Sequence, residues 1–380
     1  MTVEPQQVAD EVARRSDETL ALVRAIVEYE TPTSDKASVD RLIDYLVDAM
    51  SARGMQTERL VQAEYGDLLI GRLGGGEGKP LLVMTHIDTV WPIGTLEHMP
   101  WRVEDDRASG PGIYDMKTSA AMMLTALDII ESQKIAHRPI TWIVNTEEEV
   151  GSPVSRPILE QLARESEIVM CLEPPVPPSG ALKTERKGVG MFTMEIQGRA
   201  SHAGADHAAG VSALEELARQ IQWLHSLTDY DRGTTVNVGV ASGGTKRNVV
   251  AASAEALIDL RVSTLAEAER IEPMILNAQP QLDGTSVSVT GGLNRPPMER
   301  TTSIVAAFER AKELGALIGQ SLLEGSTGGG SDGNFTAAIG VPTLDGLGCI
   351  GDGAHADHEH IVVSEIVPRT ALITMLLTHL

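Results

Sequence analysis

Three short apolar runs, each followed by an acidic residue or a histidine, constrain the fold of this chain more than any other feature. The runs are Leu81–Met84, Ile140–Val144 and Ile168–Leu172, and a helix is expected at Ser119–Glu131 between the first two. Runs of this length are typical of buried strands. Buried strands that alternate with helices favour an α/β fold with a mainly parallel sheet. Because parallel strands end at the same sheet edge, the residues after these runs are expected to meet there.

A second pattern begins near Lys187. Alternating apolar and polar residues predict strands of a half-exposed sheet, and two helical patterns lie among them. The predicted strands are at 189–197, 235–240, 254–262 and 286–290, with helices at 211–227 and 265–278. This combination predicts a smaller α+β domain over residues 188–294. It is inserted into a discontinuous domain formed by residues 1–187 and 295–380. This larger domain is expected to begin with amphipathic helices at 5–30 and 38–53 and to resume, after the insertion, with a helix at Ser303–Leu317.

The charge of the chain narrows the range of partners. Its 380 residues include 31 Lys and Arg against 53 Asp and Glu, so the net charge is −22. Nucleic acid is therefore not expected as a partner, because phosphate binding requires a surplus of cations. No apolar run reaches the roughly 18 residues of a membrane-spanning helix, and the polar start Met1–Asp17 does not resemble a secretory signal. With only Cys171 and Cys349 as cysteines, we expect a cytoplasmic protein with no membrane partner.

The residues that follow the apolar runs form a candidate metal site. His86 follows the first run, Glu148 and Glu149 the second and Glu173 the third, while Asp115 lies where a glycine-rich turn meets a helix. Carboxylates are costly to bury together unless cations neutralise them. A mixture of histidine and carboxylates suits Zn²⁺, Mn²⁺ or Co²⁺ better than Mg²⁺ or Ca²⁺. The number of carboxylates predicts two metal ions bridged by one of them.

Each member of this set also has an ordinary explanation. A His-x-Asp pair such as His86 and Asp88 is usually a surface pair, a run of glutamates is usually solvated, and Asp115 alone could cap a helix. The recurrence of these residues at successive strand ends is what favours the metal site. Within such a site, Asp88 is expected to accept a hydrogen bond from the second imidazole nitrogen of His86.

Five segments of the chain resemble motifs of one enzyme family. The matching segments are Thr85–Val90, Gly110–Lys117, Glu148–Ser152, Leu172–Pro174 and Gly353–Asp357. The resemblance covers nearly the whole chain and is to the aminoacylase/carboxypeptidase family of di-zinc metallopeptidases, with the greatest likeness to its bacterial glutamate carboxypeptidases. It implies a di-zinc exopeptidase-like catalytic domain and a smaller, ferredoxin-like dimerisation or lid domain at 188–294.

The resemblance also implies which residues bind the metals. It assigns His86 and Glu173 to one ion, Glu149 and His355 to the other, and Asp115 to the bridge between them. His358 and His360 lie close to His355 in the sequence, and His355 is chosen because it matches the motif. Two Zn²⁺ ions are expected, with Mn²⁺ or Co²⁺ as alternatives.

Glu148 is implied to be the general base, which activates a water held between the two metals. The frame within Glu147-Glu148-Glu149 follows from Gly151-Ser152, which in the family come one residue after the ligand glutamate. Met116 stands where the family often has an acidic residue, after a peptide bond that is typically cis in the family.

Three residues of the second domain resemble substrate-binding groups of the family. His202 would reach into the site of a partner subunit and stabilise the oxyanion, so a homodimer through residues 188–294 is expected. Asn248 resembles a substrate-binding asparagine. Arg295 resembles the arginine that holds a terminal carboxylate, a role that suits the geometry of a guanidinium group.

These features predict a hydrolase that cleaves an amide or peptide bond next to an amino acid with a free carboxylate, in a small molecule or short peptide. An N-acyl-amino-acid deacylase of the acetylornithine or succinyl-diaminopimelate type is the alternative within the family. A catalytically inactive binding relative is an alternative of another class. The stretch Gly329–Gly333 also fits the serine-hydrolase pattern G-x-S-x-G around Ser331, but too few residues follow it for the usual order of catalytic partners.

Overall fold

The computed structural model describes residues 4–380 and divides them into two compact units. Unit 1 comprises the described residues up to Glu185 together with Arg300–Ser326 and Ser331–Leu380, and unit 2 comprises Arg186–Glu299 and Thr327–Gly330. Each unit has its own hydrophobic core. Across residues 4–380, no helix combines the length and the apolar character needed to cross a membrane.

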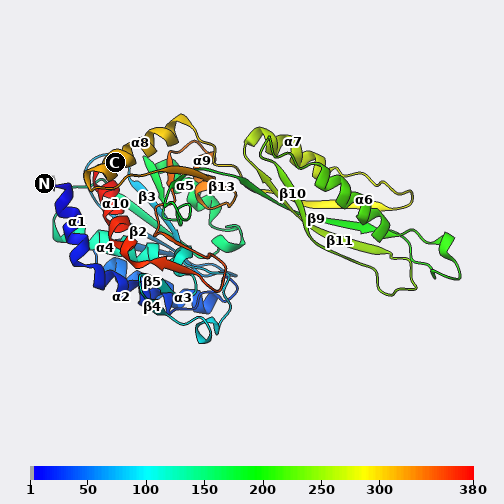
Figure 1. Ribbon diagram of the computed structural model, residues 1–380, viewed down its shortest axis with the longest axis horizontal. Coiled ribbons are helices and arrows are strands. Elements are labelled where there is room, and N and C mark those ends of the chain that lie inside the picture. Colours follow the sequence, from blue (N-terminus) through cyan, green and yellow to red (C-terminus); the bar gives the residue numbers. More distant parts are fainter. Residues whose placement is uncertain (1–3) are drawn as a thin grey trace. The chain divides into compact units, whose positions relative to one another are not determined.

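The main sheet of unit 1 confirms the predicted α/β fold (Figure 1). Its four central strands β6, β3, β7 and β14 run parallel. At the flanks, β2 pairs antiparallel with β6, β1 pairs antiparallel with β2, and β8 pairs antiparallel with β14. The strands, in sheet order, are β1 (Gln56–Leu60), β2 (Leu68–Leu73), β6 (Ile140–Asn145), β3 (Leu81–His86), β7 (Ile168–Cys171), β14 (Thr343–Asp345), β8 (Leu182–Arg186) and β13 (Glu324–Thr327).

The central strands read as continuous apolar runs because both faces of the sheet are covered. In β3, Leu81 and Val83 join one core, whereas Leu82 and Met84 join the core on the opposite face. Helices α5 and α9 pack with the second core, and the other helices pack with the first. The helices of unit 1 are α1 (Pro5–Arg14), α2 (Ser16–Val27), α3 (Lys36–Ser51), α4 (Thr118–Ser132), α5 (Arg156–Glu165), α8 (Thr302–Leu317), α9 (Gly333–Ala338) and α10 (Ile366–His379).

The single helix predicted at residues 5–30 is wrong in one respect. The segment forms two helices, α1 and α2, because Arg15 leaves helical geometry with φ −101° and ψ 10°. The break allows Val12 of α1 and Val23 of α2 both to reach the core. The helix predicted at 38–53 is α3, which begins slightly earlier because the side chain of Asp35 accepts a hydrogen bond from the amide of Ser38.

A second, small sheet in unit 1 was not predicted. Its strands, in sheet order, are β15 (Gly351–Asp352), β16 (His360–Val362), β5 (Arg107–Ser109) and β4 (Arg102–Glu104). These strands are too short to produce a clear periodicity in the sequence. Strands β15 and β16 pair antiparallel, so residues 353–359 form the loop of a hairpin.

Unit 2 is an antiparallel sheet with helices on one face (Figure 1). The strands, in sheet order, are β10 (Thr235–Gly243), β11 (Ser253–Val262), β9 (Gly188–Gln197) and β12 (Ser286–Arg295), and the helices are α6 (Ala213–Ser226) and α7 (Leu265–Leu276). Burial alternates along β11, where Ile258 and Leu260 join the core and Leu257 is exposed. The role of this unit in dimerisation or as a lid stays a prediction.

Candidate metal centre

His86, at the end of β3, is oriented by a main-chain carbonyl. Its Nδ1 lies 3.1 Å from the carbonyl oxygen of Asp88, and its Nε2 lies 3.1 Å from Asp115 Oδ1 and 3.6 Å from Glu173 Oε1. A carbonyl oxygen can only accept, so Nδ1 carries a proton and Nε2 faces the carboxylates. Burial lowers the pKa of His86, but hydrogen bonds to Asp115 and Asp88 outweigh it and raise this pKa well above its usual value. A metal ion would therefore displace the proton on Nε2.

Asp115 lies between two histidines. Its Oδ1 faces His86, and its Oδ2 lies 3.5 Å from Nε2 of His355. Burial would raise the pKa of Asp115, but the hydrogen bonds from His355 and His86 hold it well below its usual range. Asp115 lies in the short segment Ile113–Lys117 before α4, and the peptide bond between Asp115 and Met116 is cis.

The three consecutive glutamates after β6 have different environments. The buried carboxylate of Glu147 accepts hydrogen bonds from the amides of Val154 and Ser155, so it anchors the following loop. Glu148 and Glu149 instead belong to groups of potential metal ligands. Glu147, the first of the three, thus has a structural role, and the assignment of Glu149 as the ligand and Glu148 as the base stays a prediction.

Asp88 is fully buried, and its carboxylate serves the main chain of that same loop. It accepts hydrogen bonds from the amides of Glu148 at 3.2 Å and Glu149 at 3.1 Å, and from the hydroxyl of Thr33 at 2.8 Å. Its Oδ1 is 3.4 Å from His86 Nδ1, farther than its own carbonyl oxygen. Asp88 thus orients His86 chiefly through its main chain and positions the two glutamates through its side chain.

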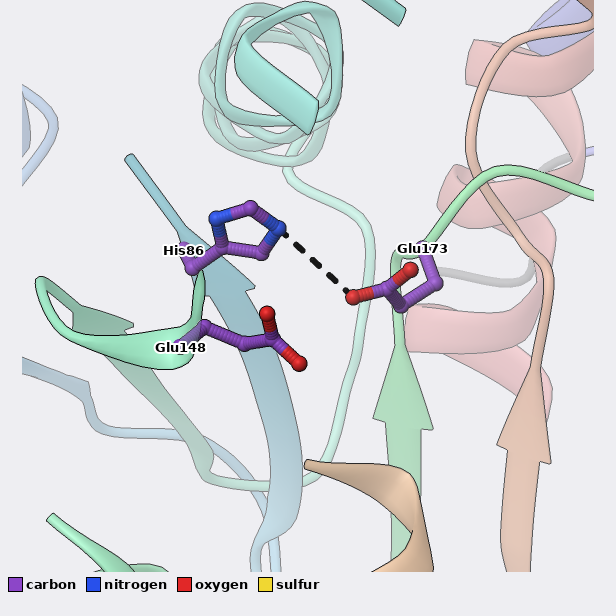
Figure 2. A group of neighbouring side chains, drawn as sticks. All are labelled: His86, Glu148 and Glu173. Atoms are coloured by element: carbon purple, nitrogen blue, oxygen red, sulfur yellow. Dashed lines mark ion pairs between the residues drawn. The ribbon is translucent and has the colours of Figure 1, made fainter. Parts of the chain in front are cut away.

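The first group of potential ligands consists of His86, Glu148 and Glu173. One ligand atom from each lies within 4.8 Å of the others. Figure 2 shows the three side chains converging from the end of β3, the loop after β6 and the segment after β7. Strand pairing of β3 with both β6 and β7 explains this convergence.

The second group consists of Asp115, Glu149 and His355, again with ligand atoms within 4.8 Å of one another. His355 Nε2 is 3.1 Å from Glu149 Oε2. Hydrogen bonds to Asp115 and Glu149 raise the pKa of His355 to about 10, and burial raises the pKa of Glu149 to about 7. Of the three histidines in this segment, His355 is the one that joins the group.

The donor set fits a pair of divalent cations. Each group offers one imidazole nitrogen and two carboxylates, a combination suited to Zn²⁺ and similar ions. Asp115 connects the groups, because its Oδ1 faces His86 of the first group and its Oδ2 faces His355 of the second. In the structure, the two histidines contact the same carboxylates whose charge bound metal ions would neutralise.

His202 and Asn248 belong to unit 2 and are not members of either ligand group. They lie on neighbouring loops, because the amide of Ala203 donates to the carbonyl of Asn248 at 3.0 Å and His202 pairs with Val249. The amides of Gly204 and Ala205 donate to His202 Nδ1 at 3.2 and 3.0 Å. Nδ1 is therefore an acceptor, so the proton of the neutral ring is on Nε2.

Arg295 is also in unit 2, at the end of β12, and only 6% of its surface is exposed. Its Nη1 donates to the side chain of Asn294 at 3.0 Å. Gly330 lies close to its side chain, where a Cβ would be 2.7 Å from Arg295 Cδ. The roles of His202, Asn248 and Arg295 stay predictions.

Ser331, the centre of the G-x-S-x-G stretch, is buried. Its hydroxyl donates to Asp345 Oδ2 at 2.8 Å and accepts from the amide of Gly333. A serine nucleophile is instead exposed on a strained turn and paired with a base. This arrangement favours a structural role for Ser331.

Two buried charged residues near the ligand groups were given no role of their own in the sequence prediction. Lys117 donates from Nζ to the carbonyl of Tyr29 at 2.6 Å, and burial lowers its pKa to about 7. Glu359, four residues after His355, accepts four hydrogen bonds. Glu359 lies two residues beyond the predicted ligand motif Gly353–Asp357, and its environment depends on distant segments, so the sequence offered little signal for it.

Comparison with protein families gives one extended match. The family model described as Peptidase family M20/M25/M40 matches residues 82–379. This range includes every predicted metal ligand and all of unit 2.

Individual proteins are similar over most of the chain. Carboxypeptidase G2 of Pseudomonas sp. (strain RS-16) is 30% identical over 366 residues, which cover 93% of this chain and 88% of that protein. A succinyl-diaminopimelate desuccinylase of Ectopseudomonas mendocina is 25% identical and covers 85% and 88%. Among solved structures, a dinuclear metal-binding peptidase of the M20 family from Bacillus subtilis shares the fold, with a TM-score of 0.69, 13% identity and coverage of 96% and 98%.

Proposed function

Because the chain belongs to peptidase family M20/M25/M40 and is a metal-dependent hydrolase, we propose that it cleaves an amide or peptide bond next to an amino acid with a free carboxylate. The observation that carries this proposal is the position of Asp115. Its two oxygens lie 3.1 Å from His86 Nε2 and 3.5 Å from His355 Nε2, one histidine from each ligand group. A single carboxylate shared in this way is suited to bridging two metal ions.

In this proposal, His86 and Glu173 would hold one Zn²⁺ ion, Glu149 and His355 would hold the other, and Asp115 would be shared between them. Mn²⁺ or Co²⁺ could take the same donors. Such ions, when bound, polarise the substrate carbonyl and lower the pKa of a bound water.

Glu148 acts as the general base and then as the general acid. One oxygen of its carboxylate lies within 4.8 Å of ligand atoms of His86 and Glu173, and its amide donates to Asp88 at 3.2 Å. It takes a proton from the attacking water and returns this proton to the departing amine nitrogen as the C–N bond breaks. The products are an amine and a carboxylic acid.

His202 supplies a hydrogen-bond donor. Since its Nδ1 accepts two main-chain hydrogen bonds, the neutral ring donates through Nε2 to the oxygen that becomes negative in the transition state. Asn248, on the neighbouring loop, binds the substrate beside it.

Arg295 binds the free carboxylate of the substrate. A buried guanidinium attracts a carboxylate more strongly than an exposed one, because water screens the interaction less. This residue gives the enzyme its preference for the end of a peptide or for an acylated amino acid.

A homodimer through unit 2 is part of the proposal. Its support is the sheet face opposite α6 and α7, where Met191, Val240 and Leu257 are exposed around a depression of about 340 Å³. Exposed apolar side chains that gather on one face are typical of an interaction surface.

An N-acyl-amino-acid deacylase is the second candidate. The similarity to a succinyl-diaminopimelate desuccinylase over 85% of the chain favours it. In both candidates the group that departs carries a carboxylate beside the amine, so the chemistry is shared and only the acyl group differs.

A substrate panel tests the proposal. The full chain is stripped of metal with a chelator and supplied in turn with Zn²⁺, Mn²⁺ and Co²⁺. Release of amino acids is measured from dipeptides, N-acyl-amino acids and the same compounds with the carboxylate converted to an amide. We expect activity to return with two ions per chain and to require the free carboxylate. Activity in the stripped protein, or equal cleavage of the amide-capped compounds, would contradict the proposal.

A further inference from the structure

Glu359 lies in the loop between β15 and β16 and is fully buried. Its Oε2 accepts hydrogen bonds from Trp91 Nε1 at 2.8 Å and from the amide of Gly112 at 2.9 Å. Its Oε1 accepts from the amides of Tyr114 at 2.9 Å and Asp115 at 3.1 Å. These four hydrogen bonds offset part of the cost of burying the carboxylate, and burial still raises the pKa of Glu359 above its usual value.

The main chain before Asp115 is shaped to receive this carboxylate. Gly112 has φ +70°, the left-handed region, and a Cβ there would lie 2.5 Å from a methyl group of Thr89. This turn directs several amides to one side, an arrangement that binds anions. Here the anion is a side chain of the same protein.

The contacts of Glu359 join three segments that each carry a proposed metal ligand. Trp91 follows His86 by five residues, the amide of Asp115 belongs to the proposed bridge, and Glu359 itself follows His355 by four residues. The hairpin loop is turned by hydrogen bonds from Ala356 to Gly353 and from Glu359 to Ala356. A change at Glu359 is therefore transmitted to His355 and Asp115 together.

We propose that Glu359 is a positioning residue of the metal centre, which sets the separation of His355 and Asp115 and so the affinity of the second metal ion. The inference rests on the proposed function, in which these two residues bind that ion. Partners that orient metal ligands typically change metal affinity by about 10- to 100-fold when they are removed.

The variant Glu359→Gln tests the proposal with almost no change in volume. An amide NH₂ cannot accept a hydrogen bond, so two of the four donors lose their acceptor. Co²⁺ is titrated into the metal-free full chain, and its visible absorption and binding stoichiometry are recorded. We expect the second Co²⁺ to bind about 10- to 100-fold more weakly, with an altered absorption spectrum.

Glu216 provides the matched control. It is a fully buried glutamate of unit 2 that accepts hydrogen bonds from the amides of Gln281 and Leu282 and from the side chains of Gln220 and Thr285. Glu216→Gln should lower the Tm while leaving both Co²⁺ affinities unchanged. This variant separates loss of a buried anchor in general from loss of the anchor at the metal centre.

The outcomes are distinguishable. If the wild-type chain binds two Co²⁺ ions and Glu359→Gln binds both with unchanged affinity and spectrum, the inference is wrong and the proposed function stands. If the wild-type chain does not bind two ions, the proposed function fails first. Should Glu359→Gln not fold, Trp91→Phe removes one donor to Oε2 and leaves the carboxylate. A several-fold weaker second site would then support the inference, and an unchanged site would overturn it.

Discussion

The candidate residues of unit 1 and unit 2 are held in place in different ways. In unit 1, several potential metal ligands follow buried strands, namely His86, Glu148, Glu149 and Glu173. The buried carboxylates of Asp88 and Glu359 accept hydrogen bonds from the main chain of the segments that carry potential ligands. In unit 2, His202 and Asn248 are exposed on paired loops, and Arg295 alone is buried. We therefore expect substitutions of the proposed ligands and their anchors in unit 1 to change metal binding. Substitutions in unit 2, like that of the proposed base Glu148 in unit 1, should change turnover or substrate affinity while the metals remain bound.

The largest effect is expected at Glu148. Replacing it with glutamine removes the proposed base, so kcat should fall by about 10²- to 10⁴-fold. Metal content, measured by mass spectrometry of the purified chain, should remain at two ions. Because Glu148 is grouped with His86 and Glu173, a loss of one ion would instead identify it as a ligand.

His202→Ala should have the next largest effect. Loss of one donor to a developing oxyanion lowers kcat by roughly 10²- to 10³-fold. Since His202 is not in either ligand group, the metal content should not change. Steady-state kinetics and metal analysis on the same preparation check both parts, and near-normal kcat would remove His202 from the mechanism.

Arg295→Lys should act mainly on KM. A bond between a guanidinium and a carboxylate contributes about 1.5–3 kcal/mol, so KM should rise roughly 10- to 100-fold for substrates with a free carboxylate. Amide-capped substrates should show no such rise. Arg261→Lys is a control, because Arg261 pairs with Asp259 in the same unit. Equal changes in the two variants would argue against a specific role for Arg295.

The smallest predicted effect is that of pH on metal affinity. Hydrogen bonds to Asp115 and Glu149 raise the pKa of His355 to about 10, so this ring is protonated at neutral pH and must release a proton to bind metal. The affinity for the metal ion proposed to bind His355 and Glu149 should thus fall about tenfold per pH unit on acidification. Below pH 7 the fall should steepen, since burial raises the pKa of Glu149 to about 7 and a second proton then competes. Zn²⁺ titrations at pH 6, 7 and 8 measure the slope, and a flat profile would contradict this prediction.

The strands were predictable where the sheet is covered on both faces or on one face along the whole strand. Leu81–Met84 and Ile140–Val144 are apolar throughout because both faces of their strands are covered, and the alternation in β11 reflects a sheet covered on one face. The break at Arg15 was not predictable, because the apolar spacing continues through it. Strands as short as β15 leave no periodic pattern.

For the candidate site, the sequence predicted which residues could act as ligands but not the contacts that each of them makes. Strand ends placed His86 and Glu173 near each other in the prediction. The frame of the three glutamates came only from the resemblance at Gly151-Ser152, because residue type alone does not distinguish Glu147 from Glu148. The difference arises because Glu147 meets the amides of Val154 and Ser155. Glu359 escaped prediction for the same reason, since its partners lie more than 240 residues earlier in the chain.

The sequence by itself determined the alternation of the longer buried strands and helices and the supply of histidines and carboxylates at the strand ends, because hydrophobic periodicity and residue type are local properties. Only the tertiary structure decided which atoms meet: that Asp115 faces two histidines, that Asp88 orients His86 through its main chain, and that one buried carboxylate joins three ligand-bearing segments. Hydrogen bonds require donor and acceptor to lie about 3 Å apart, and that proximity comes from the packing of distant segments.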